Sequence, residues 1–235
     1  MWRPSVVAAV LIAGTALAQD AAAPRVALDG ALTPLAGPVA IGGAGWGPFR
    51  RICTTRAMLR ADGSEAAGGS PECLLVTAVR EDRGTWHVTL QTEPRGTAAP
   101  FAYAATRDAA GRIGTVTAMP PGGMAPLSAA QRREAEERLR RMLRAIGVER
   151  MTIAPGGRVA LPMPPDDTGA EGALDCRPLG EGLVGGRRVV VASCDRQGEP
   201  LGGQVAIDVA TGLALRQAHA FTARAGRGVT RQGLE

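Results

Sequence analysis

One segment of this chain repeats its apolar residues with the period of an α-helix, whereas almost every other apolar run has the length and alternation of a β-strand. In residues 129–146 the apolar side chains fall at i, i+4, i+7, i+8 and i+11 of one stripe: Ala135, Leu139, Met142, Leu143 and Ile146. Ser128 and Gln131 have the spacing of a capping box, and Gly147 is placed to end the helix in a left-handed conformation. We predict one amphipathic helix over 129–146 that packs on a sheet.

Strand-like runs lie on both sides of that helix. In the clearest one, apolar and polar residues alternate along 84–91. In each flanking region two runs are joined by a turn that opens with Asp and closes with Gly, at 108–111 and 208–212. The pattern predicts an α+β fold that is mainly antiparallel β, a curved sheet, half-barrel or sandwich with one packed amphipathic helix.

The same pattern of residues divides the chain into segments. Residues 1–18 are predicted to be a signal peptide and residues 19–48 an extended leading segment. Residues 49–223 are predicted to form a single β-rich domain, with halves 49–120 and 148–223 on either side of the helix. Residues 224–235 contain three glycines, so we expect a flexible tail that frays.

The signal peptide is predicted from Arg3, an apolar stretch over residues 6–17 and small residues at Ala16 and Ala18. The stretch is too short to span a membrane with ease, and no later segment reaches 18 consecutive apolar residues. No Cys lies near Ala18 to carry a lipid. We therefore expect export to the periplasm or the extracellular space, without a transmembrane anchor.

Four cysteines follow the predicted signal peptide: Cys53, Cys73, Cys176 and Cys194. In an oxidising compartment an even number of cysteines indicates disulfides, and four allow three connectivities. We favour Cys53 with Cys73 and Cys176 with Cys194, because each pair is close in sequence and joins two strand-like runs. A metal or redox site is disfavoured, since the chain has no Cys-x-x-Cys motif and no His beside a cysteine.

All 27 basic residues are arginines, and loss of Arg3 would leave 26 of them against 22 acids, a charge of +4. The densest group of arginines lies in the predicted helix and alternates with glutamates. Three pairs there have the favourable i,i+4 order: Glu134 with Arg138, Glu136 with Arg140, and Glu137 with Arg141. We predict a solvated, self-paired helix face. With six aromatic residues after cleavage, we expect no nucleic-acid partner.

The usual catalytic and cofactor motifs are absent. The chain has no His-Glu-x-x-His and no Gly-x-Ser-x-Gly. The glycines of 42–47 lack the flanking strand and helix of a dinucleotide loop, and Asp166, Asp167 and Glu171 lack the spacing of a calcium loop. We assign no catalytic residue, no cofactor and no metal ligand.

Two histidines remain as candidates for a site. His87 falls on the polar face of its strand. His219 and Gln217 share the parity of Leu213, Leu215 and Phe221, so in a regular strand both would face the core and need partners, or line a pocket. A bulge that turns them outward is the more frequent arrangement.

The order of β half, helix, Pro-rich passage and β half, together with the turn Asp208-Val209-Ala210-Thr211-Gly212-Leu213, resembles families of exported bacterial proteins of unknown function over residues 84–222. In those families an Asp-x-x-Thr-Gly-Leu turn closes the last hairpin of a curved half-barrel around a helix. The resemblance implies this fold and carries no catalytic residues. Curved-sheet periplasmic carriers of lipids are an analogy at the level of fold.

We therefore expect a non-catalytic binding module for an apolar small molecule or lipid, or for another envelope protein. The alternatives are a secreted hydrolase-type enzyme that uses His219 or His87, and a structural envelope protein. A concave sheet face filled by the helix, rather than left open, would remove the carrier hypothesis.

Overall fold

A computed structural model describes residues 24–43, 45–60, 64–66, 68–94, 100–121, 125–162, 172–196, 202–223 and 226–235. The predicted signal peptide and the acidic residues 166, 167 and 171 lie outside this part of the chain. The first half contains β2 (Arg51–Met58), β3 (Glu72–Asp82), β4 (Thr85–Thr92), β5 (Ala102–Arg107) and β6 (Ile113–Met119). After helix α2 (Ala129–Ile146) follow β8 (Val159–Pro162), β9 (Ala173–Val184), β10 (Arg187–Arg196), β11 (Gly202–Asp208), β12 (Ala214–Ala223) and β13 (Gly226–Leu234).

These eleven strands form one antiparallel sheet in the order β6-β5-β4-β3-β2-β13-β12-β11-β10-β9-β8. Each half is a meander, and the two halves join where β2 pairs with β13. A small second sheet pairs β1 (Val39–Ile41) with β7 (Met151–Ile153). The prediction of a mainly antiparallel β fold with one packed helix is confirmed for the described residues.

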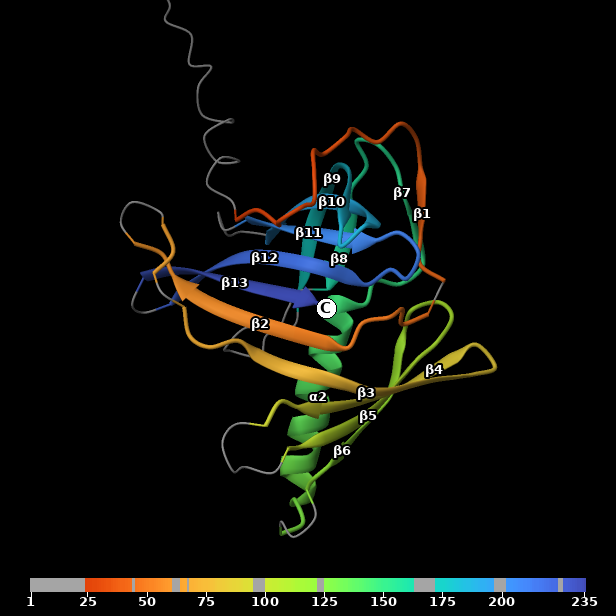
Figure 1. Cartoon of the computed structure of the whole chain (residues 1–235), viewed down its shortest axis with the longest axis vertical. Helices are drawn as coiled ribbons and strands as arrows, with labels where there is room; N and C mark the ends of the chain where they lie inside the picture. Colours follow the sequence, from red (N-terminus) through yellow and green to blue (C-terminus); the bar gives the residue numbers. More distant parts are fainter. Residues whose placement is uncertain are drawn as a thin grey trace, which may run out of the picture.

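The large sheet curves around α2 (Figure 1). The helix contacts β6 and β8, which are the two edge strands, and also β12 near the middle of the order. One helix reaches such distant strands only from the concave side. Along β6 it packs closely, whereas it meets β12 at its C-terminal end, where the side chain of Gln217 bonds the Ala145 carbonyl.

Helix α2 has the predicted bounds because its start is encoded locally. The Gln131 N–H donates to Ser128 Oγ at 3.2 Å, and the Ser128 N–H donates to Gln131 Oε1 at 3.0 Å, which completes the capping box. Gly147 ends the helix in extended backbone rather than in the predicted left-handed conformation, and its N–H donates to the Leu143 carbonyl. The apolar stripe is buried in the core at Leu139, Leu143 and Ile146.

The second half of the sheet is covered on both faces. Alternate residues of β10 enter different cores: Val189 and Val191 pack in the core that contains Trp46 and Phe49, whereas Val190 and Ala192 pack in a core with β1 and β7. Residues 24–33 cross the convex face, where Thr33 pairs with Glu181 of β9. The glycine-rich residues 179–184 continue β9, and Gly180 leaves room for the Thr33 backbone.

The C-terminal residues are the clearest departure from expectation. We predicted a fraying tail over 224–235, yet residues 226–234 form β13, which pairs with β12 on one side and with β2 on the other. The glycines permit close packing here: a Cβ at Gly228 would overlap the Phe221 ring, and one at Gly233 would lie 2.8 Å from the Arg216 guanidinium. This strand joins the two halves, a non-local role that composition does not reveal.

Both favoured disulfides are present. Cys53–Cys73 links β2 to β3, and Cys176–Cys194 links β9 to β10, each between directly paired residues. The first lies on the convex side of the sheet and the second is buried on the concave side. Two disulfides, with no free cysteine in the chain, indicate an oxidising environment.

Candidate functional site

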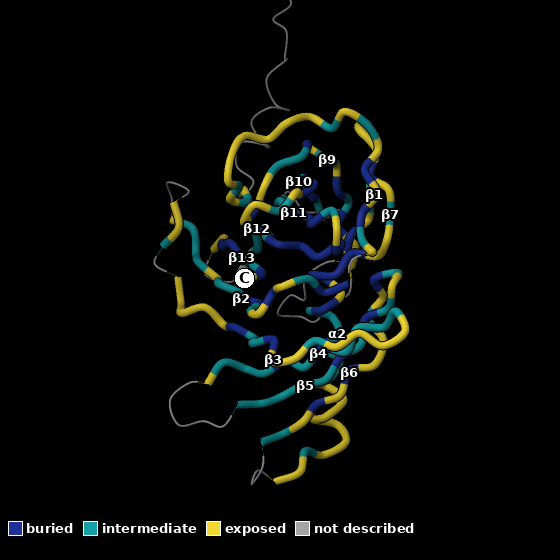
Figure 2. The backbone as a smooth tube through the Cα atoms, turned by 45° about the vertical axis from the view of Figure 1, so that its right-hand side comes forward, coloured by how far each residue is buried: buried dark blue, intermediate teal, exposed yellow. Residues whose placement is uncertain are grey.

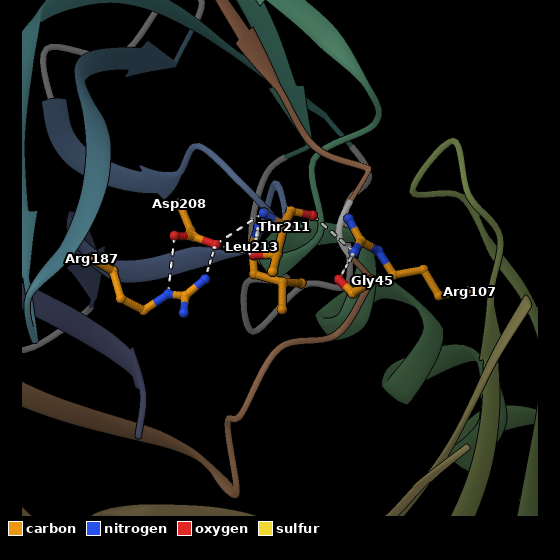
Figure 3. A network of polar contacts seen from close by, with 6 residues as sticks. All are labelled: Gly45, Arg107, Arg187, Asp208, Thr211 and Leu213. Carbon is orange, nitrogen blue, oxygen red and sulfur yellow. Dashed lines mark hydrogen bonds and ion pairs between the residues drawn. The ribbon is translucent and has the colours of Figure 1, made fainter. Parts of the chain in front are cut away.

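Arg107, the last residue of β5, is the centre of a buried polar cluster that we call the hub (Gly45, Arg107, Gly111, Val148 and Thr211). Its side chain donates to the carbonyls of Gly45 at 2.8 Å, Thr211 at 3.0 Å, Gly111 at 3.2 Å and Val148 at 3.2 Å. Figure 3 shows its bonds to Gly45 and Thr211. Burial lowers the pKa of Arg107 to about 10, so the guanidinium stays charged at neutral pH and its donors are matched by carbonyls.

The Asp-x-x-Thr-Gly-Leu turn adjoins the hub. The buried Asp208 carboxylate accepts two bonds from Arg187, at 3.1 and 2.8 Å, and two from Thr211, through its backbone N–H at 2.9 Å and its hydroxyl at 2.5 Å (Figure 3). The Thr211 hydroxyl oxygen in turn accepts from the Leu213 N–H at 3.2 Å. Each oxygen of the carboxylate thus has a partner inside the turn or its supporting arginine. The motif on which the resemblance rests therefore has a structural role.

The turns of the two halves meet at one carbonyl. Gly111 and Gly212 both have positive φ, of 92° and 70°. A Cβ on either glycine would crowd the Val148 carbonyl oxygen, at 2.7 Å and 2.9 Å respectively. Only glycine fits both requirements at these two positions. The hub therefore holds both turns and the segment after α2 together and closes one end of the molecule.

Gln217 and His219 lie on the concave face of β12, away from the turn. The Gln217 amide donates to the Ala145 carbonyl of α2 at 2.7 Å, and its Oε1 lies 3.2 Å from His219 Nε2. Because Oε1 can only accept, His219 Nε2 carries the proton in this bond. Burial lowers the pKa of His219 to about 4, so the imidazole is neutral at pH 7.

The bulge that we expected in β12 exists, but its effect is the opposite of the expected one. Ile207 pairs with Ala214 and Ala206 with Arg216, which leaves Leu215 as the extra residue. Gln217 stays 4% exposed and points toward the helix. The expectation that a bulge turns this pair outward is wrong, because the buried carbonyl at the end of α2 and the neighbouring imidazole satisfy the amide.

The register extends this polar pair across the central strands, the name we use for β12, β13 and β2. Directly paired residues share a face, so Gln217, Gln232 and Thr54 form one row, and His219 and Thr230 belong to the next. Gln232 Nε2 donates to Thr54 Oγ1 at 3.3 Å. We call these five residues the polar belt (Thr54, Gln217, His219, Thr230 and Gln232). All five are uncharged at pH 7.

The structure does not bring His87 to His219. His87 neighbours Val88 in β4, and Val88 packs in the core on the concave side, so His87 faces the convex side. Sequence reasoning found Gln217 and His219 through their parity but missed Arg107, Thr54 and Gln232. The last two become neighbours of Gln217 only through the non-local pairing of β13.

The described residues offer little further chemistry. In that part of the chain no three His, Cys, Asp or Glu side chains gather as metal ligands would, and the one helix is not both long and apolar enough to cross a bilayer. Gly45 serves packing and the hub, since a Cβ there would overlap the Trp86 ring. No protein-family model matches the chain, and no curated protein matches it significantly.

Proposed function

We propose that this protein is an exported, non-catalytic binding module that holds an amphiphilic small molecule against the concave face of its central strands. The supporting observation is how unevenly that face is covered. Helix α2 packs on the concave face of the first half through Leu139, Leu143 and Ile146, but reaches β12 only near Ala145. Figure 2 shows β2 as mostly intermediate, and β12 changes from mostly buried over residues 214–218 to intermediate over residues 219–221.

The side chains beyond the helix have the composition of a site for an amphiphile. Met58 and Phe221 lie opposite Gly228 on the same face as the polar belt, and both are only partly buried. Tyr103, paired with the buried Leu90, is partly buried on the neighbouring part of the face. Ligand sites combine such apolar walls with a few polar groups. The concave face is thus filled at the hub end and only partly covered over the central strands.

The geometry of His219 favours this proposal over a hydrolase. With its pKa lowered to about 4, the imidazole is a weak base at neutral pH, and its hydrogen-bond partner is an amide rather than the carboxylate that orients a catalytic histidine. The disulfides fit export, and the predicted signal peptide would deliver the chain to the periplasm or beyond.

Native mass spectrometry of protein purified gently from its own host tests the proposal, together with titration of the neutral fluorescent probe N-phenyl-1-naphthylamine. We expect a retained apolar ligand, and probe binding that Met58→Glu weakens at least about tenfold, since the change buries a charge against an apolar wall. Thr117→Glu on the exposed convex face of β6 is the matched control. An apo mass together with no probe binding would overturn the proposal, and a co-purifying protein would favour an envelope partner instead.

A further inference from the structure

Two arginines of α2 lack the partners that the sequence predicts for them. Glu137 pairs with Arg140 at 2.7 Å instead of with Arg141, and Glu136 accepts from the Ala118 N–H of β6 at 3.1 Å instead of pairing with Arg140. The predicted pairs of Glu134 with Arg138 and of Glu137 with Arg141 do not form among the described residues, and for the second the reason is that Glu137 turns toward Arg140.

Arg141 is the more unusual of the two. Its Nε atom is buried and has no hydrogen-bond acceptor among the described residues. A buried guanidinium donor without an acceptor costs more free energy than an exposed one, so such groups are rare unless a ligand or water completes them. The described residues supply no carboxylate for it, which leaves this position open to an external anion.

Both arginines lie on the side of α2 that carries the buried Ala145, opposite the side from which Glu136 reaches β6. Arg141 precedes Ala145 by four residues and follows Arg138 by three, so the three residues share one side of the helix. Ala145 meets Gln217 of β12 through its carbonyl. Burial raises the pKa of Tyr103, and the nearby positive charge of Arg138 opposes that rise.

We propose that Arg138 and Arg141 bind the anionic head group, a carboxylate or a phosphate, of the amphiphile whose apolar part lies on the central strands. This inference rests on the proposed function. The planar guanidinium fork matches both head groups, because each presents two oxygens side by side. The polar belt on the opposite wall is neutral and can donate hydrogen bonds without repelling the anion. Arg56 and Glu72, on the same face, already have interaction partners.

Calorimetric titration of the mature chain with oleate, dodecyl phosphate and neutral monoolein tests the inference. We expect oleate or dodecyl phosphate to bind at least about tenfold more tightly than monoolein, and the better of the two identifies the head group. Arg141→Gln should weaken binding of the anionic ligands about tenfold and leave monoolein unchanged. Arg132→Gln, at an exposed position in the first turns of the same helix, is the matched control and should change neither.

The outcomes separate the two proposals. Equal affinity for all three ligands, with Arg141→Gln without effect, would overturn the anionic head group and leave the binding module standing. No binding of any ligand would overturn both. If Arg141→Gln fails to fold, Arg138→Gln provides the same comparison at an exposed residue, and Arg141→Lys keeps the charge without the fork.

Discussion

The two halves of the sheet are built alike and covered differently. Each half is a meander with one cross-strand disulfide and an Asp-to-Gly turn, at 108–111 and 208–212. In β6 of the first half only Val116 and Ala118 are buried, between exposed neighbours, whereas β10 of the second half buries four consecutive residues, Val189 to Ala192. The second half has covers on both faces, and the first half has α2 on one. We infer that the doubly covered half is the scaffold of the fold.

The two turns show the same chemistry in two surroundings. In both, the Gly N–H donates to the Asp carbonyl at 2.9 Å, and the Asp side chain accepts from a backbone N–H within the turn at 2.9 Å. The Asp108 side chain is 40% exposed and pairs with the exposed Arg112, whereas the Asp208 side chain is 2% exposed and pairs with the half-buried Arg187. Substitutions at matched positions can therefore isolate the effect of burial.

The largest losses of stability are expected on removal of the disulfides. Their loops are similar, with separations of 20 and 18 residues, so the chain-entropy effect is about 3 kcal/mol for each. The pair Cys176→Ala and Cys194→Ala should cost roughly 1 kcal/mol more than Cys53→Ala and Cys73→Ala, because it also leaves a cavity in the buried core. Urea unfolding of both double variants measures the difference. Equal losses would show that burial of the bridge adds nothing.

The next largest loss of stability is expected at Arg107, because its side chain joins the two halves of the sheet. Arg107→Ala leaves four carbonyls of the hub without their donor, and we expect a loss of about 3 kcal/mol in the free energy of unfolding. Arg107→Lys should recover little, since an ammonium cannot reproduce the fork. The control is Arg112→Ala in the adjacent exposed turn, expected to cost about 1 kcal/mol or less. A loss of stability in Arg107→Ala as small as that in Arg112→Ala would contradict the role of Arg107 in holding the hub together.

Asp208→Asn and Asp108→Asn compare the turns directly. The first leaves Arg187 beside a neutral amide in a buried site and should cost about 2 kcal/mol, whereas the second should cost about 1 kcal/mol or less at a solvated turn. Thermal unfolding of the two variants at pH 7 provides the measurement. If Asp108→Asn costs as much stability as Asp208→Asn, local hydrogen bonding rather than burial determines the stability of both turns.

The last effect is absent at pH 7 and concerns acid stability. Folding lowers the pKa of His219 to about 4 from an ordinary value near 6.5. Between these values the unfolded chain binds a proton that the folded protein does not, so stability is full above about pH 6.5 and decreases as the pH falls toward 4, by about 2 kcal/mol. His219→Gln should flatten this part of the curve relative to the parent, measured by urea unfolding at pH 4.5 and 7. An unchanged difference between the two pH values would contradict a neutral, buried imidazole.

Local signals predicted much of this fold. The capping box at Ser128 and the stripe through Leu143 define α2, and the alternation of apolar and polar residues located the strands. Both signals come from residues that are close together in the sequence. The disulfides also followed from short separations. For the candidate site, parity identified Gln217 and His219, but not which way a bulge would turn them.

The sequence by itself determined the helix and most of the strands, favoured the cysteine pairing that the structure has, and marked the Asp-to-Gly segments as turns, since neighbours along the chain decide each of these. Tertiary structure decided that residues 226–234 join the halves, that Arg107 is buried among carbonyls, and that the glutamates of α2 leave Arg138 and Arg141 unpaired. The physical reason is the same in all three. Their partners are distant in sequence, and the free energy of each contact exists only after the sheet has curved around its helix.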